Sequence, residues 1–213
     1  MSFLKNSFFI SFEGIDGCGK STQVRLLSEK MNSESVNTLV VREPGGHAIS
    51  EDIRKILLNN EYFNMSIRTE ALLMASSRSQ LTKDIIIPAL KKRSLIIADR
   101  YSDSTLAYQG GGRGIDVKWL ISLNKFATYN IEPDLTIYID VDVEEGLMRR
   151  KIKNSDRLES LGYEFQEKVR NQYLKLVKLF PERIVTINGM QSTEEICKEI
   201  WEAIMNRINL NER

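Results

Sequence analysis

The sequence predicts an α/β fold of three layers, in which a five-stranded parallel sheet is covered by helices on both faces. Short apolar runs alternate along the chain with longer segments of helical periodicity, and this alternation is typical of right-handed βαβ crossovers. The runs are rich in Ile, Val and Phe nearly throughout, as expected for strands buried on both faces. The 213 residues contain no repeat and no long Pro/Gly linker, so we expect residues 1–213 to form a single domain.

Each expected strand is an apolar run that stops at a polar loop, and each expected helix is a longer amphipathic segment between two such runs. The expected strands are Phe8–Glu13, Thr38–Arg42, Leu95–Asp99, Leu135–Asp140 and Ile184–Ile187. The expected helices lie near Lys20–Met31, Ala48–Leu58, Ile67–Lys92, Val117–Ala127, Val143–Lys151, Leu161–Leu179 and Thr193–Ile208.

The charge balance excludes a global positive field. Lys plus Arg is 30 and Asp plus Glu is 29, so the net charge is +1, and neither nucleic acid nor a membrane surface is an expected partner. Any bound anion must therefore be held by a local arrangement of side chains and backbone. The first apolar run is interrupted by Glu13 and Asp16, which indicates a buried strand and not a signal peptide or membrane span.

The cysteines and the histidine limit which metal sites and disulfides are possible. Cys18 and Cys197 are the two cysteines, and they are far apart with no metal-like spacing, which fits a reducing, cytoplasmic setting. His47 is the single histidine, so a site with several His ligands is excluded. His47 could act alone as an acid or base, but a surface-loop histidine is the favoured interpretation.

Polar loops follow the ends of four expected strands. After the glycine-rich turn at the first strand come "REPGGH" (Arg42–His47), "DRYSDST" (Asp99–Thr105) and "DVDVEE" (Asp140–Glu145). In open parallel sheets, ligands bind outside the carboxyl ends of the strands. We therefore expect these four loops to converge on one edge of the sheet and form the functional site.

The glycine-rich turn Gly14-Ile-Asp-Gly-Cys-Gly-Lys20-Ser21 matches G-x-x-x-x-G-K-[ST] between an expected strand and an expected helix. Its glycines let backbone N–H groups point into one concavity, and the following helix presents its positive end. Lys20 can reach β- and γ-phosphate oxygens and Ser21 can ligate Mg²⁺. The turn therefore predicts a P-loop NTPase fold that binds a nucleoside triphosphate, which the family resemblance described below implies to be ATP. The residues expected to bind it are Gly14, Ile15, Asp16, Gly17, Cys18, Gly19, Lys20, Ser21 and Thr22.

The remainder of the chain favours a small kinase over other P-loop classes. A GTPase should carry N-K-x-D, but Asn124-Lys125 is followed by Phe126-Ala127. A mechanical ATPase usually drives a larger assembly, whereas this chain reads as one compact domain. Two alternatives stay open: a kinase for another nucleoside monophosphate or a nucleoside, and a regulatory P-loop protein that binds nucleotide without transferring phosphate.

Four motifs together resemble the thymidylate kinase family of P-loop nucleoside monophosphate kinases, in its bacterial form. They are "FEGIDGCGKST", "REPGG", "DRYSDSTLAYQGGGRG" and "DRLE" (Asp156–Glu159), in the family's order and spacing. The resemblance implies ATP-dependent, Mg²⁺-requiring phosphorylation of dTMP to dTDP in dTTP biosynthesis. It also implies a homodimer, typically formed through long helices such as Ile67–Lys92.

The resemblance also implies a lid at about residues 149–159 that supplies catalytic cations. Gly17 stands where one subclass of the family carries an arginine, and the bacterial subclass uses lid cations instead. Arg149, Arg150 and Arg157 are the candidates, although a solvated helix face is the usual meaning of such a charge run, and Arg157 could instead pair with Asp156.

On the acceptor side, the resemblance places Asp99 near Mg²⁺ and the transferring group, and makes Arg100 the clamp on the acceptor phosphate. Arg42 is a second anion-binding candidate, or else an ion-pair partner of Glu13 or Glu43. Asp16 matches the residue that meets the sugar 3′-hydroxyl, and Glu159 matches an acid that helps position the same region.

The remaining expected substrate contacts concern the base. Arg78 matches a residue that reads a thymine carbonyl, and Thr105 and Tyr108 match residues that line the base and sugar. Met74, one helical turn from Arg78, stands where the family usually stacks a phenylalanine on the base, or else is ordinary core. His47 replaces the threonine usual after "REPGG". Lys20, Asp99, Arg100 and the lid arginines are thus the expected catalytic residues, and Ser21 with Asp99 the expected metal ligands.

Overall fold

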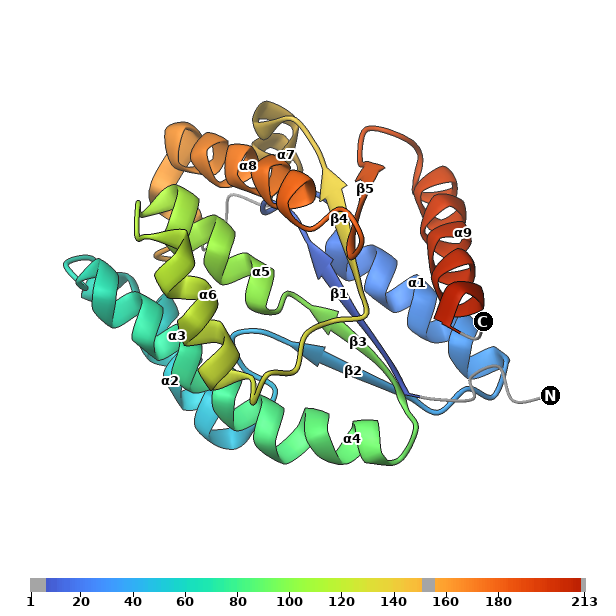
Figure 1. Ribbon diagram of the computed structural model, residues 1–213. Helices are drawn as coiled ribbons and strands as arrows, with labels where there is room; N and C mark the ends of the chain where they lie inside the picture. Colours follow the sequence, from blue (N-terminus) through green and yellow to red (C-terminus); the bar gives the residue numbers. More distant parts are fainter. Residues whose placement is uncertain (1–6, 151–155, 212–213) are drawn as a thin grey trace.

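The computed structural model describes residues 7–150 and 156–211 and has the predicted α/β architecture (Figure 1). A five-stranded, all-parallel sheet has the strand order β2-β3-β1-β4-β5. Its strands are β1 (Phe8–Glu13), β2 (Thr38–Arg42), β3 (Leu95–Asp99), β4 (Leu135–Asp140) and β5 (Ile184–Asn188).

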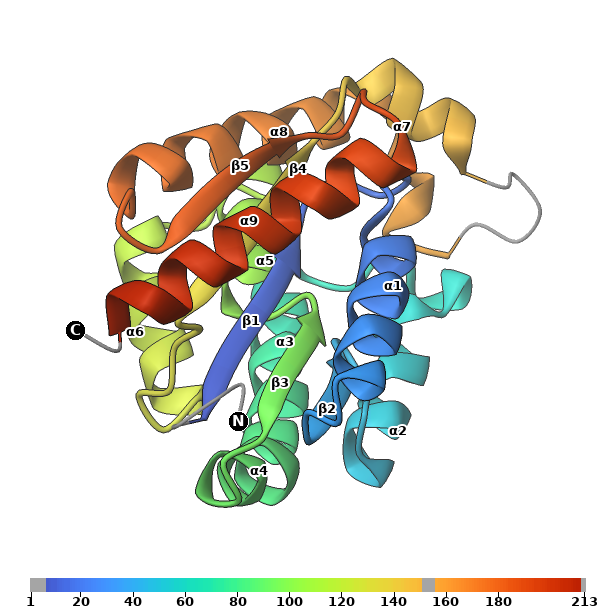
Figure 2. The ribbon, with the colours of Figure 1, turned by 90° about the vertical axis from the view of Figure 1, so that its right-hand side faces the viewer.

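The helices lie on both faces of this sheet. In Figure 2, α1 and α9 cross the face toward the viewer, whereas α3 to α6 and α8 lie behind it. This division follows from right-handed crossovers, since β1 connects to β2 in one direction along the sheet and the later strands follow in the other. The helices are α1 (Lys20–Ser33), α2 (Ala48–Leu58), α3 (Ile67–Leu81), α4 (Ile87–Lys91), α5 (Ser102–Thr105), α6 (Val117–Ala127), α7 (Val143–Arg149), α8 (Gly162–Leu179) and α9 (Thr193–Asn211).

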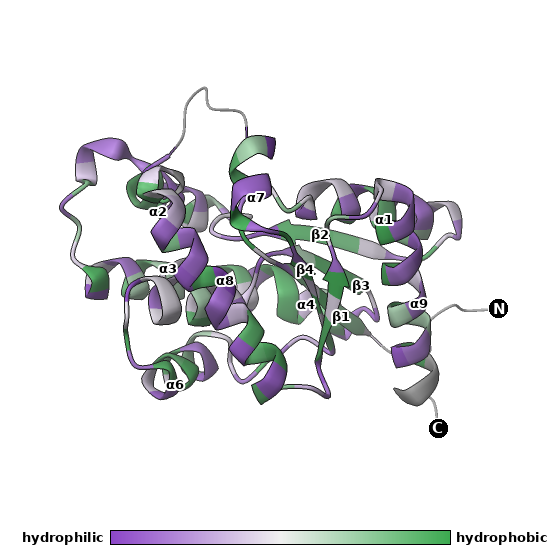
Figure 3. Cartoon of the chain, turned by 90° about the horizontal axis from the view of Figure 1, so that it is seen from above, coloured by the Kyte–Doolittle hydropathy of each residue, from purple (hydrophilic) through white to green (hydrophobic). Residues whose placement is uncertain are grey.

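Strand burial depends on position in the sheet. Every residue of the central β1 is buried, and β3 and β4 are buried up to their last residue. The edge strands β2 and β5 are partly exposed, which corrects the expectation that all strands are covered on both faces. Seen from above, the sheet is mostly hydrophobic while the helices mix both classes of residue (Figure 3). Among the described helices, none combines the length and apolarity needed to cross a membrane.

The single helix expected over Ile67–Lys92 is divided in three. α3 ends at Leu81, a π-helical segment runs over Thr82–Ile86, and α4 begins at Ile87 with Pro88 in its first turn. Proline has no N–H to donate and its ring collides with the carbonyl four residues before it, so a regular helix cannot continue through Pro88. The wider π turn accommodates that break.

The expected loop Asp99–Thr105 contains the short helix α5, which continues into a π-helical segment, Leu106–Gly112, where no helix was expected. Its run of three glycines normally indicates a loop. Here the glycines permit close packing instead: a Cβ on Gly111 would lie 2.4 Å from Cβ of Gln172, and one on Gly112 would lie 2.5 Å from the Phe165 ring. The segment therefore packs directly on α8. Two further short 3-10 turns, Asn60–Tyr62 and Glu159–Leu161, were also not expected.

Candidate active site

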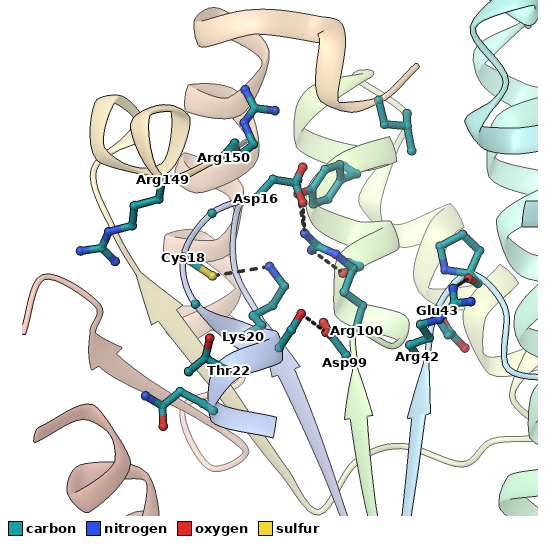
Figure 4. Close-up of a pocket in the computed structure, with 18 of the residues that line it drawn as sticks. Asp16, Cys18, Lys20, Thr22, Arg42, Glu43, Asp99, Arg100, Arg149 and Arg150 are labelled. Carbon is teal, nitrogen blue, oxygen red and sulfur yellow. Dashed lines mark hydrogen bonds and ion pairs between the residues drawn. The ribbon is translucent and has the colours of Figure 1, made fainter. Parts of the chain in front are cut away.

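Three of the four polar loops line one cavity of about 780 Å³ at the carboxyl edge of the sheet (Figure 4), whereas no residue of the fourth, Asp140–Glu145, lines it. Because the strands are parallel, the residue that ends each strand opens toward the same edge. Gly14, Ile15 and Arg157 do not line the cavity, and nothing is described for the side chain of Glu159. The predicted site residues that do line it are Asp16, Gly17, Cys18, Gly19, Lys20, Ser21, Thr22, Arg42, Met74, Arg78, Asp99, Arg100, Thr105, Tyr108, Arg149 and Arg150.

The P-loop wraps around the ammonium group of Lys20. Lys20 Nζ donates to the carbonyl oxygens of Gly14 (3.2 Å) and Ile15 (2.9 Å) and lies 3.5 Å from Sγ of Cys18. Gly19 has φ of +96° and caps α1 without a side-chain bond to the first turn. The N–H groups that open α1 therefore donate to no capping side chain, which is the arrangement that binds phosphate at a helix N-terminus.

Gly17 has a strict packing requirement. Its φ is +83°, and an added Cβ would lie 2.1 Å from the carbonyl oxygen of Gly146 in α7. Both constraints exclude a side chain here, so the first turns of α7 close directly over the P-loop. The glycine at this position is therefore required by the packing of this chain.

We expect Gly17→Ala to raise the KM for ATP and lower the melting temperature. The methyl group has no space against the Gly146 backbone and favours a negative φ, so the P-loop and α7 must separate. Steady-state kinetics and thermal unfolding measure the two effects. Gly162→Ala is the matched control, since Gly162 also has a positive φ (+72°) but nothing lies within 4 Å of its added Cβ. Equal KM values for ATP in the two variants would contradict the packing argument.

A hydroxyl and a carboxylate meet beside the P-loop. Ser21 Oγ donates to Oδ2 of Asp99 at 2.6 Å, and both residues line the cavity. Oxygen ligands of this kind suit Mg²⁺, which keeps several waters and takes few protein ligands alongside substrate phosphates. Among the described residues there is no cluster of three or more His, Cys, Asp or Glu side chains that could hold a metal by itself. The donor set therefore fits Mg²⁺ brought with a nucleotide.

Arg100 lies at the floor of the cavity in a left-handed conformation, with φ of +72°. Its Nη2 donates to Asp16 Oδ1 (2.5 Å) and to the Tyr108 hydroxyl (3.0 Å), and its Nη1 donates to the Gly14 carbonyl (2.9 Å). Burial alone would raise the pKa of Asp16, but the charges of Arg100 and Lys20 outweigh it and hold that pKa below its usual value. Asp16 is therefore an ionised acceptor at the junction of the P-loop and Arg100.

Arg78 forms the wall of the cavity on the side of α3 and is 2% exposed. Its guanidinium donates to Glu43 Oε2 (2.7 Å), Thr105 Oγ1 (2.8 Å) and Asn124 Oδ1 (2.8 Å), as well as to a backbone carbonyl. Met74, one turn before it, is half-buried and lines the same wall. Burial raises the pKa of Glu43 to about 7, against the opposing charge of Arg78.

The expected lid arginines occupy different surroundings. Arg149 Nε donates to Glu145 (2.7 Å) and its Nη1 to the Gly189 carbonyl (3.0 Å), and in Figure 4 Arg149 and Arg150 both point away from Lys20. Residues 151–155 of the expected lid lie outside the described residues. Arg157 is 4% exposed, and its Nη1 donates to Glu70 Oε2 at 2.7 Å.

Three charged residues have roles that the sequence did not indicate. Arg42 pairs with Glu51 at 3.0 Å, and not with Glu13 or Glu43, because α2 starts directly after the "REPGGH" loop and brings Glu51 beside it. Arg54, on the same helix, lines the cavity and donates to the Pro44 carbonyl (2.8 Å). The sequence feature that could have indicated this role of Arg54 is its position in α2, one turn after Glu51. Glu13 is fully buried beneath the site.

Comparisons with known proteins agree with the geometry. A family model described as thymidylate kinase matches residues 12–200. The chain is 49% identical over 196 residues to the thymidylate kinase of Caldanaerobacter subterraneus subsp. tengcongensis, covering 92% of this chain and 94% of that one. It is 50% identical over 192 residues to the protein of that name from Thermosipho africanus, covering 90% and 94%. The crystal structure of thymidylate kinase from Ehrlichia chaffeensis superposes with a TM-score of 0.78 at 32% identity, over 93% of this chain and 99% of that one.

Proposed function

The chain belongs to the thymidylate kinase family and phosphorylates dTMP to dTDP, and on that premise we propose which of its residues bind each substrate. One observation supports this assignment: the P-loop lysine and a group of arginines line the same cavity. ATP, the donor used by the family, would place its triphosphate on the P-loop, and dTMP would place its phosphate toward Arg100. A phosphate monoester dianion is already nucleophilic, so the reaction needs positioning and charge neutralisation more than a general base.

On the donor side, we propose that Lys20 exchanges its carbonyl partners in the P-loop for β- and γ-phosphate oxygens. The N–H groups at the start of α1 would hold the same phosphates. Ser21 and Asp99 would hold Mg²⁺, which when bound neutralises charge on the phosphates of ATP. The short Ser21–Asp99 hydrogen bond keeps the two oxygens side by side for that purpose.

On the acceptor side, we propose that Arg100, Arg42 and Arg54 bind the phosphate of dTMP. A planar guanidinium suits a phosphomonoester better than an ammonium does. Asp16 would accept a hydrogen bond from the sugar 3′-hydroxyl, and Tyr108 would crowd a ribose 2′-hydroxyl. Thr105 and Arg78 would face the base, with Met74 against its ring and Glu159 near the sugar.

We further propose that residues 1–213 act as one domain with a lid at about 149–159. Arg149 and Arg150, which line the cavity at the end of α7, are the proposed cations for the transferring phosphate. Arg157 has a different proposed role, as the buried anchor of the lid's far end through Glu70. An arginine supplied to a transferring phosphate is worth roughly 10³–10⁵ in rate.

A coupled assay with dTMP, dUMP, dCMP, AMP and GMP as acceptors tests the selectivity of this site. We expect the highest kcat/KM with dTMP, because Arg78 and Tyr108 are fixed by buried hydrogen bonds and define the acceptor pocket. Preference for another acceptor would indicate a kinase of different specificity. No transfer to any acceptor would favour the alternative of a regulatory nucleotide-binding protein.

We propose that the protein is a homodimer through the outer face of α2, α3 and α6. These helices pack side by side in Figure 1, and α3 contacts both of the others. Their outer surfaces expose large apolar side chains, a feature of interaction sites. The exposed residues are Ile49, Ile56, Ile67, Leu72, Trp119 and Phe126.

Leu72→Glu is expected to convert the dimer to a monomer, because it places a charge in the centre of that apolar face. Sedimentation velocity measures the change. Leu179→Glu is the matched control: Leu179 lies on α8 and is 56% exposed, compared with 50% for Leu72. The proposed interface fails if both variants sediment like the parent.

A further inference from the structure

The carboxylate of Glu13 lies directly beneath the acceptor pocket without lining it. Glu13 is the last residue of β1 and its side chain is completely buried. Oε1 accepts from Ser11 Oγ (2.8 Å) and from the Tyr101 N–H (2.7 Å). Oε2 accepts from Ser104 Oγ (2.5 Å) and from the Tyr173 hydroxyl (2.8 Å). Four donors from β1, the turn after β3, α5 and α8 thus converge on one buried acceptor.

One of these donors fixes the backbone of Arg100. The left-handed conformation of Arg100 costs a residue with a Cβ of the order of 1–3 kcal/mol unless its surroundings enforce it. Its own N–H donates to the Phe12 carbonyl (3.0 Å), and the next N–H, of Tyr101, donates to Glu13. The two successive amides of the turn are therefore both held by the end of β1.

A second path fixes the side chain of Arg100. Ser104 Oγ lies 2.5 Å from Glu13 Oε2 and 3.3 Å from Arg100 Nη1. Ser104 donates its one hydroxyl proton to Glu13 Oε2. The lone pairs of Ser104 are then left to accept from Arg100. Glu13 thereby sets the direction of the hydroxyl that supports the guanidinium.

Burial of the Glu13 carboxylate costs desolvation free energy. Burial raises its pKa, as does the nearby carboxylate of Asp103, while Arg100 acts in the opposite direction. An apolar side chain that only filled this space would avoid the desolvation cost of a carboxylate. The four converging hydrogen bonds offset that cost, and two of them lead to Arg100.

We propose that Glu13 is a positioning residue for the acceptor phosphate: it locks the left-handed turn and the guanidinium of Arg100 from beneath the pocket. The proposal rests on the proposed role of Arg100 as the phosphate clamp. Glu13 itself touches neither nucleotide. Its effect belongs to dTMP binding and not to ATP binding, because the P-loop contacts of ATP do not pass through Ser104 or Tyr101.

Glu13→Gln tests this proposal. The amide keeps the size of the side chain, but its NH₂ group only donates, so one pair of the four donors loses its acceptor. With the amide oxygen toward Tyr101, the NH₂ faces Ser104, and the Ser104 hydroxyl must turn its proton to another acceptor, which weakens its support of Arg100. We expect the Kd of dTMP, measured by calorimetry, and the KM for dTMP to rise about tenfold, which is the loss of one charge-assisted hydrogen bond. The KM for ATP should stay within about twofold of the parent value.

Asp103→Asn separates positioning from a general loss of stability. Asp103 is a neighbouring carboxylate, 1% exposed, that pairs with Arg183 (2.6 Å) and Thr136 (2.9 Å) and not with Arg100. Melting temperatures are measured for both variants. The expected result is that Asp103→Asn is destabilised yet keeps the parental KM for dTMP. An equal rise in that KM for both variants, or a parallel rise in the KM for ATP, would overturn the proposal.

Arg100→Ala distinguishes failure of this proposal from failure of the phosphate clamp. If Arg100→Ala raises the Kd of dTMP and Glu13→Gln does not, the clamp stands and the positioning role is wrong. If neither variant changes that Kd, Arg100 is not the clamp, and the inference about Glu13 falls with it. Should Glu13→Gln not fold, Ser104→Ala interrupts the second path alone, and an unchanged Kd in that variant overturns the proposal.

Discussion

Replacing Lys20 by Met is expected to lower kcat by on the order of 10³-fold while the fold and the affinity for dTMP are retained. In acyl and phosphoryl transfer, one preorganised group that meets developing charge typically contributes about 10²–10³ or more in rate. Lys20 is 6% exposed and already desolvated by the P-loop, so its charge acts at close range. Methionine keeps the length and apolar stem of the side chain and removes only the ammonium group.

The measurements are single-turnover transfer from ATP to dTMP, calorimetric binding of dTMP, and thermal unfolding. Lys20→Ala should give the same loss of turnover, with a further loss of stability because the buried stem is missing. Lys30→Ala is the control on the same helix, since Lys30 is exposed at the far end of α1 and stacks on Trp201. A Lys20→Met enzyme with the parental kcat would show that the P-loop does not hold the transferred phosphate.

The strands and the converging loops could be predicted from the sequence because their determinants are local. Apolar runs that end at Glu13, Arg42, Asp99 and Asp140 define both the strands and the edge to which their polar loops belong. The strand-to-helix context of Lys20 predicted the glycine-rich turn that lines the cavity. Each of these features is determined by a few consecutive residues, so a single sequence is sufficient to predict it.

The elements that the sequence did not predict depend on contacts between distant segments. The glycines at 110–112 are typical of a loop, yet they lie in a π-helical segment, and α8, more than fifty positions later, packs directly on Gly111 and Gly112. The same holds for Arg157, whose partner Glu70 lies 87 positions earlier in the chain. Its charge run indicated a solvated or catalytic face, and only the tertiary structure shows a buried ion pair.

The sequence did not predict the role of Glu13, which lies next to the P-loop motif and contacts segments that are distant in the chain. The sequence indicated Glu13 as the end of a buried strand and as a possible partner of Arg42, whereas its carboxylate accepts from the Tyr101 N–H in the turn after β3. The signal in the sequence was an acidic residue that ends a wholly buried strand. Such a carboxylate requires several donors, and these come from segments that no pattern in one sequence brings together.

Replacing Asp99 by Asn is expected to weaken the apparent affinity for Mg²⁺ by about 10- to 100-fold and to lower kcat at the Mg²⁺ concentration that saturates the parent enzyme. Asparagine has the same shape and can still accept from Ser21, whose Oγ lies 2.6 Å from Asp99 Oδ2. The substitution therefore removes the negative charge that attracts a divalent cation and leaves the neighbouring geometry in place. Titration of activity with Mg²⁺ at constant ATP and dTMP measures the shift.

The form of that titration decides between two roles for Asp99. If Asp99 acts through the cation, excess Mg²⁺ should restore a large part of kcat in Asp99→Asn, because mass action replaces the lost attraction. A fixed loss at every Mg²⁺ concentration would mean that Asp99 orients Ser21 or the acceptor and does not serve the cation. Asp140→Asn is the matched control: Asp140 also ends a strand, but it pairs with Arg170 at 2.8 Å and does not line the cavity. Its Mg²⁺ titration should match that of the parent, because the charge that this substitution removes is already committed to Arg170.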